Sequence, residues 1–167
     1  VKAFVEMPDK RLLVVSEGVD IPKIRRIAEK TPNIEVLGRV GEAHLCDLMG
    51  RCIATIYIPR DEDFGISPVE SMAAGKPVIG VQEGGLLETV GGGEAQRAEN
   101  GVGEGLLATD YGVLMVRDPG VKDVVEAVEW MTPTRALGMR RACEERAKLF
   151  DTDVFLQKMR DLIQCKV

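Results

Sequence analysis

Residues 53–81 read IATIYIPRDEDFGISPVESMAAGKPVIGV, and their pattern of apolar and polar residues indicates the type of fold. Two continuous apolar runs, Ile53–Ile58 and Pro77–Val81, flank a segment that begins polar and ends small and apolar. Continuous apolar runs are typical of strands that are covered on both faces, and the segment between them is long enough for a helix. A strand, a helix and a second strand in this order favour parallel pairing with a right-handed crossover.

The same alternation of strands and helices extends over the rest of the chain. We expect further strands at Arg11–Ser16, Ile34–Leu37 and Gly112–Val116. We expect helices at Ile21–Lys30, Glu42–Cys52, Pro68–Ala74, Val121–Met131, Pro133–Phe150 and Val154–Cys165. The sequence therefore predicts an α/β fold, with a Rossmann-like parallel sheet and helices on both faces.

Composition narrows the class of protein. The 167 residues include 22 basic and 27 acidic side chains, and the net charge is −5. A nucleic-acid partner would need clustered lysines and arginines, so this acidic balance argues against nucleic acid. No uninterrupted apolar run approaches the ~18 residues of a membrane-spanning helix. We expect one domain over residues 1–167.

The cysteines and the histidine do not form a metal-binding pattern. Cys46, Cys52, Cys143 and Cys165 lack CxxC spacing, and His44 is the single histidine. We expect reduced thiols rather than zinc ligands or disulfides.

Residues 91–110 interrupt the alternation with a Gly-rich polar stretch. A phosphate-binding loop would need the pattern GxxxxGK[ST], which is absent here. We therefore predict a flexible insertion between Gly91 and Asp110.

The start of the helix inside residues 53–81 suggests a ligand site. Ser67 as a capping hydroxyl, Pro68 at the first position and Glu70 at the third are signals of a helix N-terminus. The free amides and positive dipole end of this helix should face the carboxyl edge of the sheet, where they suit a diphosphate. Gly65 lets the backbone approach a ligand closely. Each glutamate also has a purely structural interpretation. Glu70 could act only in a capping box, and Glu62 could belong to a solvated acidic turn.

Glu62 and Glu70 are separated by seven residues, and the run EDFGISPVESMAAGKPVI resembles the EX7E motif of the retaining GT-B glycosyltransferases of family 4. Two further segments support the resemblance. Ile34–Val40 (IEVLGRV) is similar to the family's strand and turn beside the nucleobase, and Gly84–Val90 (GGLLETV) is similar to its GGxxExV loop. Within the motif, the segment EDFGI-x-PVE most resembles the mannosyltransferases of O-antigen and related surface-polysaccharide assembly.

The resemblance implies a role for each matching position. Glu62 would be the catalytic position facing the transferred sugar, and Glu70 would accept hydrogen bonds from the donor ribose. Backbone groups would supply the other contacts, with Phe64, Gly65 and Ile66 at the donor sugar and phosphates and Gly38, Arg39 and Val40 at the base.

The implied reaction is transfer of mannose from GDP-mannose to a glycan or lipid-linked acceptor, with retention of configuration and without a metal or other cofactor. Asp61 and Asp63 spell a metal-binding DxD pattern, but they fall inside the other motif, so we discount them. The family resemblance places the protein in the cytoplasm, or peripherally at the inner face of the membrane.

The resemblance also implies that the chain is one truncated half of a GT-B fold. Its first strand, a basic pair for the diphosphate and the amino-terminal, acceptor-binding partner domain would lie outside residues 1–167. We therefore expect these residues alone to show no transferase activity and at most weak donor binding.

Two alternatives keep the fold and change the function. One is a non-catalytic nucleotide-binding or scaffold domain. The other is a different GT-B enzyme, such as a nucleotide-sugar epimerase or a relative of the glucan and sucrose synthases.

Overall fold

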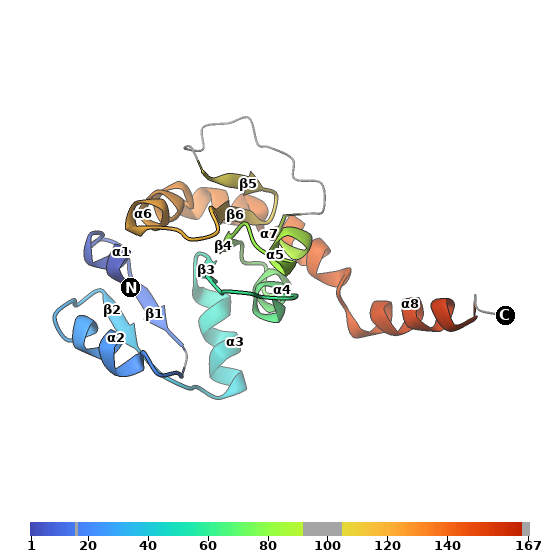
Figure 1. The fold of residues 1–167 in the computed structure, drawn as a ribbon, viewed down its shortest axis with the longest axis horizontal. Helices are drawn as coiled ribbons and strands as arrows, with labels where there is room; N and C mark the ends of the chain where they lie inside the picture. The colour runs from blue at the N-terminus through green and yellow to red at the C-terminus, as the bar shows by residue number, and fades with distance from the viewer. Residues whose placement is uncertain (16, 92–104, 165–167) are drawn as a thin grey trace.

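The computed structural model describes residues 1–15, 17–91 and 105–164 (Figure 1). Helices and strands alternate through most of this part of the chain. The helices are α1 (Lys2–Val5), α2 (Ile21–Ala28), α3 (Glu42–Arg51), α4 (Ile66–Ala73), α5 (Gly85–Thr89), α6 (Val121–Trp130), α7 (Pro133–Lys148) and α8 (Thr152–Gln164). The strands are β1 (Leu12–Val14), β2 (Ile34–Val36), β3 (Thr55–Ile56), β4 (Val78–Val81), β5 (Leu107–Thr109) and β6 (Gly112–Met115).

The strands form two sheets. β1 pairs with β2 in parallel, and the larger sheet has the order β3-β4-β6-β5. β3, β4 and β6 run parallel, with Thr55 opposite Val78 and Val78 opposite Gly112. The predicted α/β class with parallel strands is confirmed, but the strands do not form one continuous hydrogen-bonded sheet.

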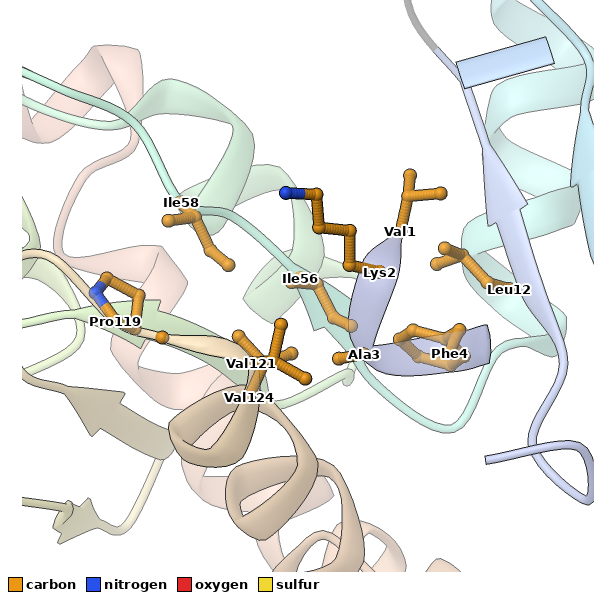
Figure 2. A pocket seen from close by; sticks show the side chains of 11 residues that line it. Val1, Lys2, Ala3, Phe4, Leu12, Ile56, Ile58, Pro119, Val121 and Val124 are labelled. Carbon is orange, nitrogen blue, oxygen red and sulfur yellow. The ribbon is translucent and has the colours of Figure 1, made fainter. Parts of the chain in front are cut away.

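Side chains, rather than strand pairing, connect the two sheets. A pocket of about 280 Å³ lies between them, and its lining includes Leu12 of β1 and Ile56 of β3 (Figure 2). The short helix α1 contributes Ala3 and Phe4 to the same lining, and α6 contributes Val124. Around this pocket, Leu12, Ile56 and Val124 pack against one hydrophobic core that includes residues of both sheets, and this core joins the sheets.

One expected loop includes a strand. The predicted insertion at residues 91–110 falls mostly outside the described residues, but β5 lies within it and pairs antiparallel with β6. The hydroxyl of Thr109 accepts a 3.1 Å hydrogen bond from the Tyr111 N–H, which closes the tight turn between the two strands. Leu107–Thr109 was missed as a strand because its short apolar run directly follows the Gly-rich polar stretch and was assigned to the same insertion.

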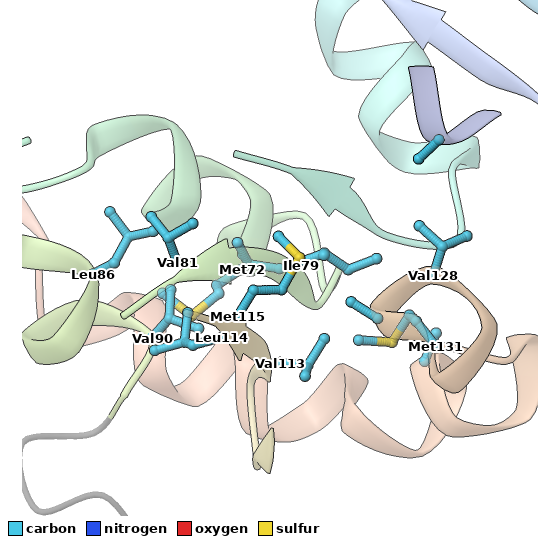
Figure 3. Close-up of a cluster of buried hydrophobic side chains, with 14 of the residues drawn as sticks. Met72, Ile79, Val81, Leu86, Val90, Val113, Leu114, Met115, Val128 and Met131 are labelled. Atoms are coloured by element: carbon cyan, nitrogen blue, oxygen red, sulfur yellow. The ribbon is translucent and has the colours of Figure 1, made fainter. Parts of the chain in front are cut away.

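The core lies around β4 and β6, all of whose residues are buried (Figure 3). α4 packs against α7, and α6 packs against β6. The fully buried side chains of the core include Met72, Val78, Val81, Leu86, Val90, Val113, Leu114, Met115 and Cys143. Apolar burial around these strands holds their carboxyl ends in place.

The last helices begin near their predicted positions. Pro133 opens α7, and the Thr132 side chain caps it by accepting from the Arg135 N–H at 3.3 Å. α8 extends away from the rest of the fold and has no buried residue (Figure 1). Among the described residues, no helix is both long and apolar enough to cross a membrane.

Candidate functional site at the carboxyl ends of the strands

A pocket of about 380 Å³ lies where three strands of the larger sheet end. Residues 61–63 follow β3, residues 82–84 follow β4, and Arg117 follows β6. The lining residues are Asp61, Glu62, Asp63, Gln82, Glu83, Gly84, Leu87 and Arg117. Ligands of open α/β sheets bind at this edge, so the position of the pocket agrees with the position predicted for the site.

Glu62 is held by three hydrogen bonds. Its carboxylate accepts from the Tyr57 hydroxyl at 2.6 Å, from the Gly65 N–H at 3.0 Å and from the Phe64 N–H at 3.3 Å. The Tyr57 hydrogen bond first, and then the two amides, lower the pKa of Glu62 below its ordinary value. The same hydrogen bond raises the pKa of Tyr57 to about 12. Glu62 is therefore an ionised hydrogen-bond acceptor at neutral pH.

Two of the amides expected to face the donor point elsewhere. The Phe64 and Gly65 N–H groups donate to Glu62, so their contact with a donor sugar or phosphate would require the carboxylate to move. The ring of Phe64 also packs edge-on against Phe150, which follows α7, with 5.6 Å between ring centroids. The loop that carries Glu62 is thus supported by a distant part of the chain.

The helix after this loop begins earlier than predicted. Gly65 is the N-cap residue of α4, in a left-handed conformation with φ 85° and ψ 65°, and Ile66 is the first helical residue. Ser67 does not cap the helix, and Pro68 is the third helical residue, where its missing N–H costs no intrahelical bond. The predicted cap at Ser67 and start at Pro68 were wrong, because the left-handed turn at Gly65 begins the helix two residues earlier.

Glu70 does not act in a capping box. Its side chain is exposed on α4 and makes no hydrogen bond or ion pair with the described residues. Glu70 is also absent from the lining of the pocket that contains Glu62. The structure therefore leaves this carboxylate accessible to a ligand without bringing it into the same hollow.

The glycine pair after β4 packs against the Glu62 loop. The Gly85 N–H donates a 3.1 Å hydrogen bond to the Glu62 carbonyl, and Gly84 has a left-handed φ of 47°. A Cβ on Gly85 would lie 2.3 Å from the Phe64 Cα, and one on Gly84 would lie 2.1 Å from the Glu62 carbonyl oxygen. The segment read as a GGxxExV loop therefore contains all of α5 with its cap residues Gly84 and Val90, and both glycines are needed for the contact of its start with the site.

The residues predicted to line the base follow the smaller sheet. Gly38 comes after β2 with a φ of 71° and is buried. Arg39 is exposed, and Val40 is half-buried. None of these three lines the pocket of Glu62, so their role at the base stays a prediction from the resemblance.

Two charged residues of the pocket were not assigned a role from the sequence. Arg117 pairs with Glu83 at 2.9 Å and with Asp61 at 3.2 Å. Their position directly after β6 and β4 is the only signal in the sequence that could have indicated them. Among the described residues, no group of three histidines, cysteines or acidic residues could hold a metal ion.

Comparison with known proteins identifies the family. The family model described as "Glycosyl transferases group 1" matches residues 2–148. The chain belongs to the group 1 glycosyl transferases. It is 58% identical over 43 residues to the α-1,3/1,6-mannosyltransferase ALG2 of Dictyostelium discoideum, a match that covers 26% of this chain and 10% of that protein. An uncharacterised glycosyltransferase of Methanocaldococcus jannaschii is 34% identical over 84 residues, covering 49% of this chain and 24% of that protein.

Solved glycosyltransferases share the fold of this group 1 member. Sucrose-phosphate synthase from Thermosynechococcus elongatus matches with a TM-score of 0.74 and 22% identity, over 98% of this chain and 40% of that one. Anabaena HepE in complex with UDP and glucose matches with a TM-score of 0.70 and 16% identity, over 99% of this chain and 43% of that one. The group 1 chain thus spans less than half of each of these structures.

Proposed function

We propose that this chain is the nucleotide-sugar-binding domain of a retaining glycosyltransferase that transfers mannose from GDP-mannose to a glycan or lipid-linked acceptor. The observation that carries the choice of mannose is the 58% identity with the Dictyostelium mannosyltransferase. The solved relative in complex with UDP and glucose supports a nucleotide-sugar as the class of donor. The acceptor site belongs to the amino-terminal partner domain that we propose for the intact enzyme.

The chemistry of the pocket fits sugar hydroxyls. Asp61, Glu62, Asp63 and Glu83 line it, and Arg117 is the only cation among its described lining residues. Carboxylates accept hydrogen bonds from hydroxyls and repel phosphates, so we assign this pocket to the transferred sugar. Neutralisation of the diphosphate is assigned to groups outside it.

In the proposed reaction, the bond from the sugar C1 to the diphosphate oxygen breaks and a bond from C1 to the acceptor oxygen forms. The diphosphate oxygen leaves with the electron pair and takes up the proton that the acceptor hydroxyl loses. Ionised Glu62, held by Tyr57 and two amides, would bind a hydroxyl of the donor sugar. This contact would orient the C1 atom of the sugar toward the attacking acceptor oxygen. The catalysis would then rest on positioning and on charge stabilisation at the leaving group.

Isothermal titration calorimetry of the 167-residue chain tests the donor. We expect weak binding of GDP-mannose and weaker binding of UDP-glucose and UDP-N-acetylglucosamine. Glu62→Gln should weaken GDP-mannose binding by about tenfold, the cost of about 1.4 kcal/mol for one charge-assisted hydrogen bond. Glu126→Gln makes the same change on an exposed residue of α6 and should leave binding unaltered.

Other outcomes of these binding and transfer experiments would each refute a different part of the proposal. Tighter binding of a UDP-sugar than of GDP-mannose would refute GDP-mannose as the donor, but it would keep the proposed sugar site. Binding of GDP-mannose that is unaffected by Glu62→Gln would favour a nucleotide-binding domain in which Glu62 has no part. A radiolabelled transfer assay should show no turnover by these residues alone, and turnover would refute the proposed need for a partner domain.

A further inference from the structure

Two arginine–aspartate pairs join the loop after β3 to the loop after β6. Arg60 lies 3.8 Å from Asp118, and Asp61 lies 3.2 Å from Arg117. Both side chains of the first pair are highly exposed, at 87% and 78%. An exposed ion pair of this kind contributes little to stability. The pairs are therefore distinguished by the other residues that Arg60 and Arg117 contact.

Arg117 also pairs with a carboxylate that is almost entirely buried. Glu83 is 7% exposed, and its Oε1 lies 2.9 Å from the Arg117 guanidinium. The same oxygen accepts a 2.9 Å hydrogen bond from the backbone N–H of Asp61. A buried carboxylate is costly unless it is paired, and removing one partner leaves the charge uncompensated.

The residue held by this carboxylate has an unusual backbone. Asp61 has a φ of 54°, and it is the one non-glycine residue with positive φ in the described part of the chain. A non-glycine residue in this conformation persists when surrounding contacts hold it. Its dihedral angles set the direction in which the chain continues into Glu62.

We propose that Arg117 is a positioning residue for Glu62, acting through Glu83 and the backbone of Asp61 to fix the loop that carries the carboxylate. Arg117 neutralises Glu83, Glu83 holds the Asp61 amide, and the loop then places Glu62 within reach of Tyr57 and the Phe64 and Gly65 amides. The catalytic meaning of this arrangement rests on the proposed function, but the positioning itself does not.

The test compares Arg117→Gln with Arg60→Gln in the 167-residue chain. Both variants remove one positive charge from the same pair of loops, but only Arg117 contacts buried Glu83. The readout is ¹³C NMR titration of the Glu62 carboxyl, assigned with Glu62→Gln. Other groups that face this region are Tyr57, Asp61, Asp63 and Glu83.

We expect Arg117→Gln to raise the Glu62 midpoint toward the ordinary value of about 4.3, because the loop releases the carboxylate from its donors. Arg60→Gln should leave the midpoint as in the wild type. The difference should persist in 1 M salt, where the Debye length of about 3 Å screens a direct charge effect. A shift that vanishes in salt, or one that is equal in both variants, would overturn the proposal.

Two further variants guard against loss of the fold, which circular dichroism and thermal unfolding will report. Arg117→Lys keeps one charged contact to Glu83 and should restore much of the wild-type midpoint. The double variant Glu83→Met with Arg117→Gln leaves no buried charge unpaired and removes the acceptor of the Asp61 N–H, so it should show the same Glu62 midpoint as Arg117→Gln. A wild-type midpoint in a folded Arg117→Gln or double variant would contradict the proposal.

GDP-mannose binding separates this proposal from the proposed function. Arg117→Gln should weaken binding severalfold, and Arg60→Gln should not weaken it. If the wild-type chain binds no nucleotide-sugar but the Glu62 midpoint still shifts in Arg117→Gln, the positioning role holds and the proposed function fails. If binding is intact and the midpoint does not move, the positioning role fails alone.

Discussion

The hydroxyl of Tyr57 donates a 2.6 Å hydrogen bond to the carboxylate of Glu62. Tyr57 lies directly after β3, and its N–H still pairs with the Ile79 carbonyl of β4. The strand therefore orients the hydroxyl, and the hydroxyl orients the carboxylate at the edge of the pocket. This is the shortest of the contacts that hold Glu62.

Replacement of Tyr57 by phenylalanine should raise the pKa of Glu62, because the largest cause of its depression is lost. A carboxyl with a depressed pKa in the folded state stabilises the fold above its unfolded pKa, and this stability is lost as the pH falls through the folded pKa. The stability difference between the wild type and Tyr57→Phe should thus be largest at neutral pH and shrink below about pH 4. Urea unfolding across pH measures it.

Tyr111→Phe is the matched control for this prediction. It removes the hydroxyl of the other tyrosine. The ring of Tyr111 lies beside the Arg146 guanidinium and away from Glu62. Its stability should follow the wild type at every pH. An identical pH profile for Tyr57→Phe and Tyr111→Phe would show that the hydrogen bond to Glu62 contributes nothing.

Gly85→Ala should destabilise the fold by about 1–3 kcal/mol, since the added methyl group would lie 2.3 Å from the Phe64 Cα and force the backbone apart. Gly138→Ala is the comparison, because nothing lies within 4 Å of its added Cβ in α7. It should stabilise the protein by up to about 1 kcal/mol through helix propensity. Denaturant unfolding with unchanged slopes measures the stability of both variants through their midpoints. Equal changes in stability for Gly85→Ala and Gly138→Ala would contradict the close packing of α5 on the Glu62 loop.

Met72→Ala should cost about 2–5 kcal/mol, because the side chain is fully buried between α4 and the sheet and leaves a cavity. Met159 is 41% exposed on α8, and Met159→Ala should change stability by less than about 0.5 kcal/mol. Thermal unfolding of the two variants checks the position of the core. A small loss for Met72→Ala would place α4 outside it.

Cys143 should resist thiol reagents that modify Cys46. Burial raises the pKa of the Cys143 thiol to about 12, so the reactive thiolate is scarce at pH 8, and the side chain is inaccessible. Cys46 is exposed on α3. Mass spectrometry of labelled peptides should detect modification of Cys143 only in denaturant, and equal labelling rates in the native protein would contradict the packing of α7.

The local signals in the sequence located most of the elements. Mostly apolar runs marked β1, β2, β3, β4 and β6 to within a few residues. Of these strands, only β4 and β6 are buried throughout, as expected of strands that are covered on both faces. Pro133 located the start of α7, and the cap at Thr132 is seen only in the structure. The start of α4 was misplaced because Ser67, Pro68 and Glu70 form a capping pattern that the left-handed turn at Gly65 overrides.

Three features follow from the linear chain: the fold class, the edge of the sheet at which the candidate site lies, and the family resemblance carried by the spacing of Glu62 and Glu70. Each of these depends on burial period, chain direction or residue order, all of which are present in the linear chain. The folded chain was needed to establish the direction of the Glu62 carboxylate, the contact of Gly85 with the Glu62 loop and the pairing of Arg117 with Glu83. The Glu62 carboxylate is directed by the turn of its own loop, and the contacts of Gly85 and Arg117 join the ends of different strands, so they form only after the sheet has brought those ends together.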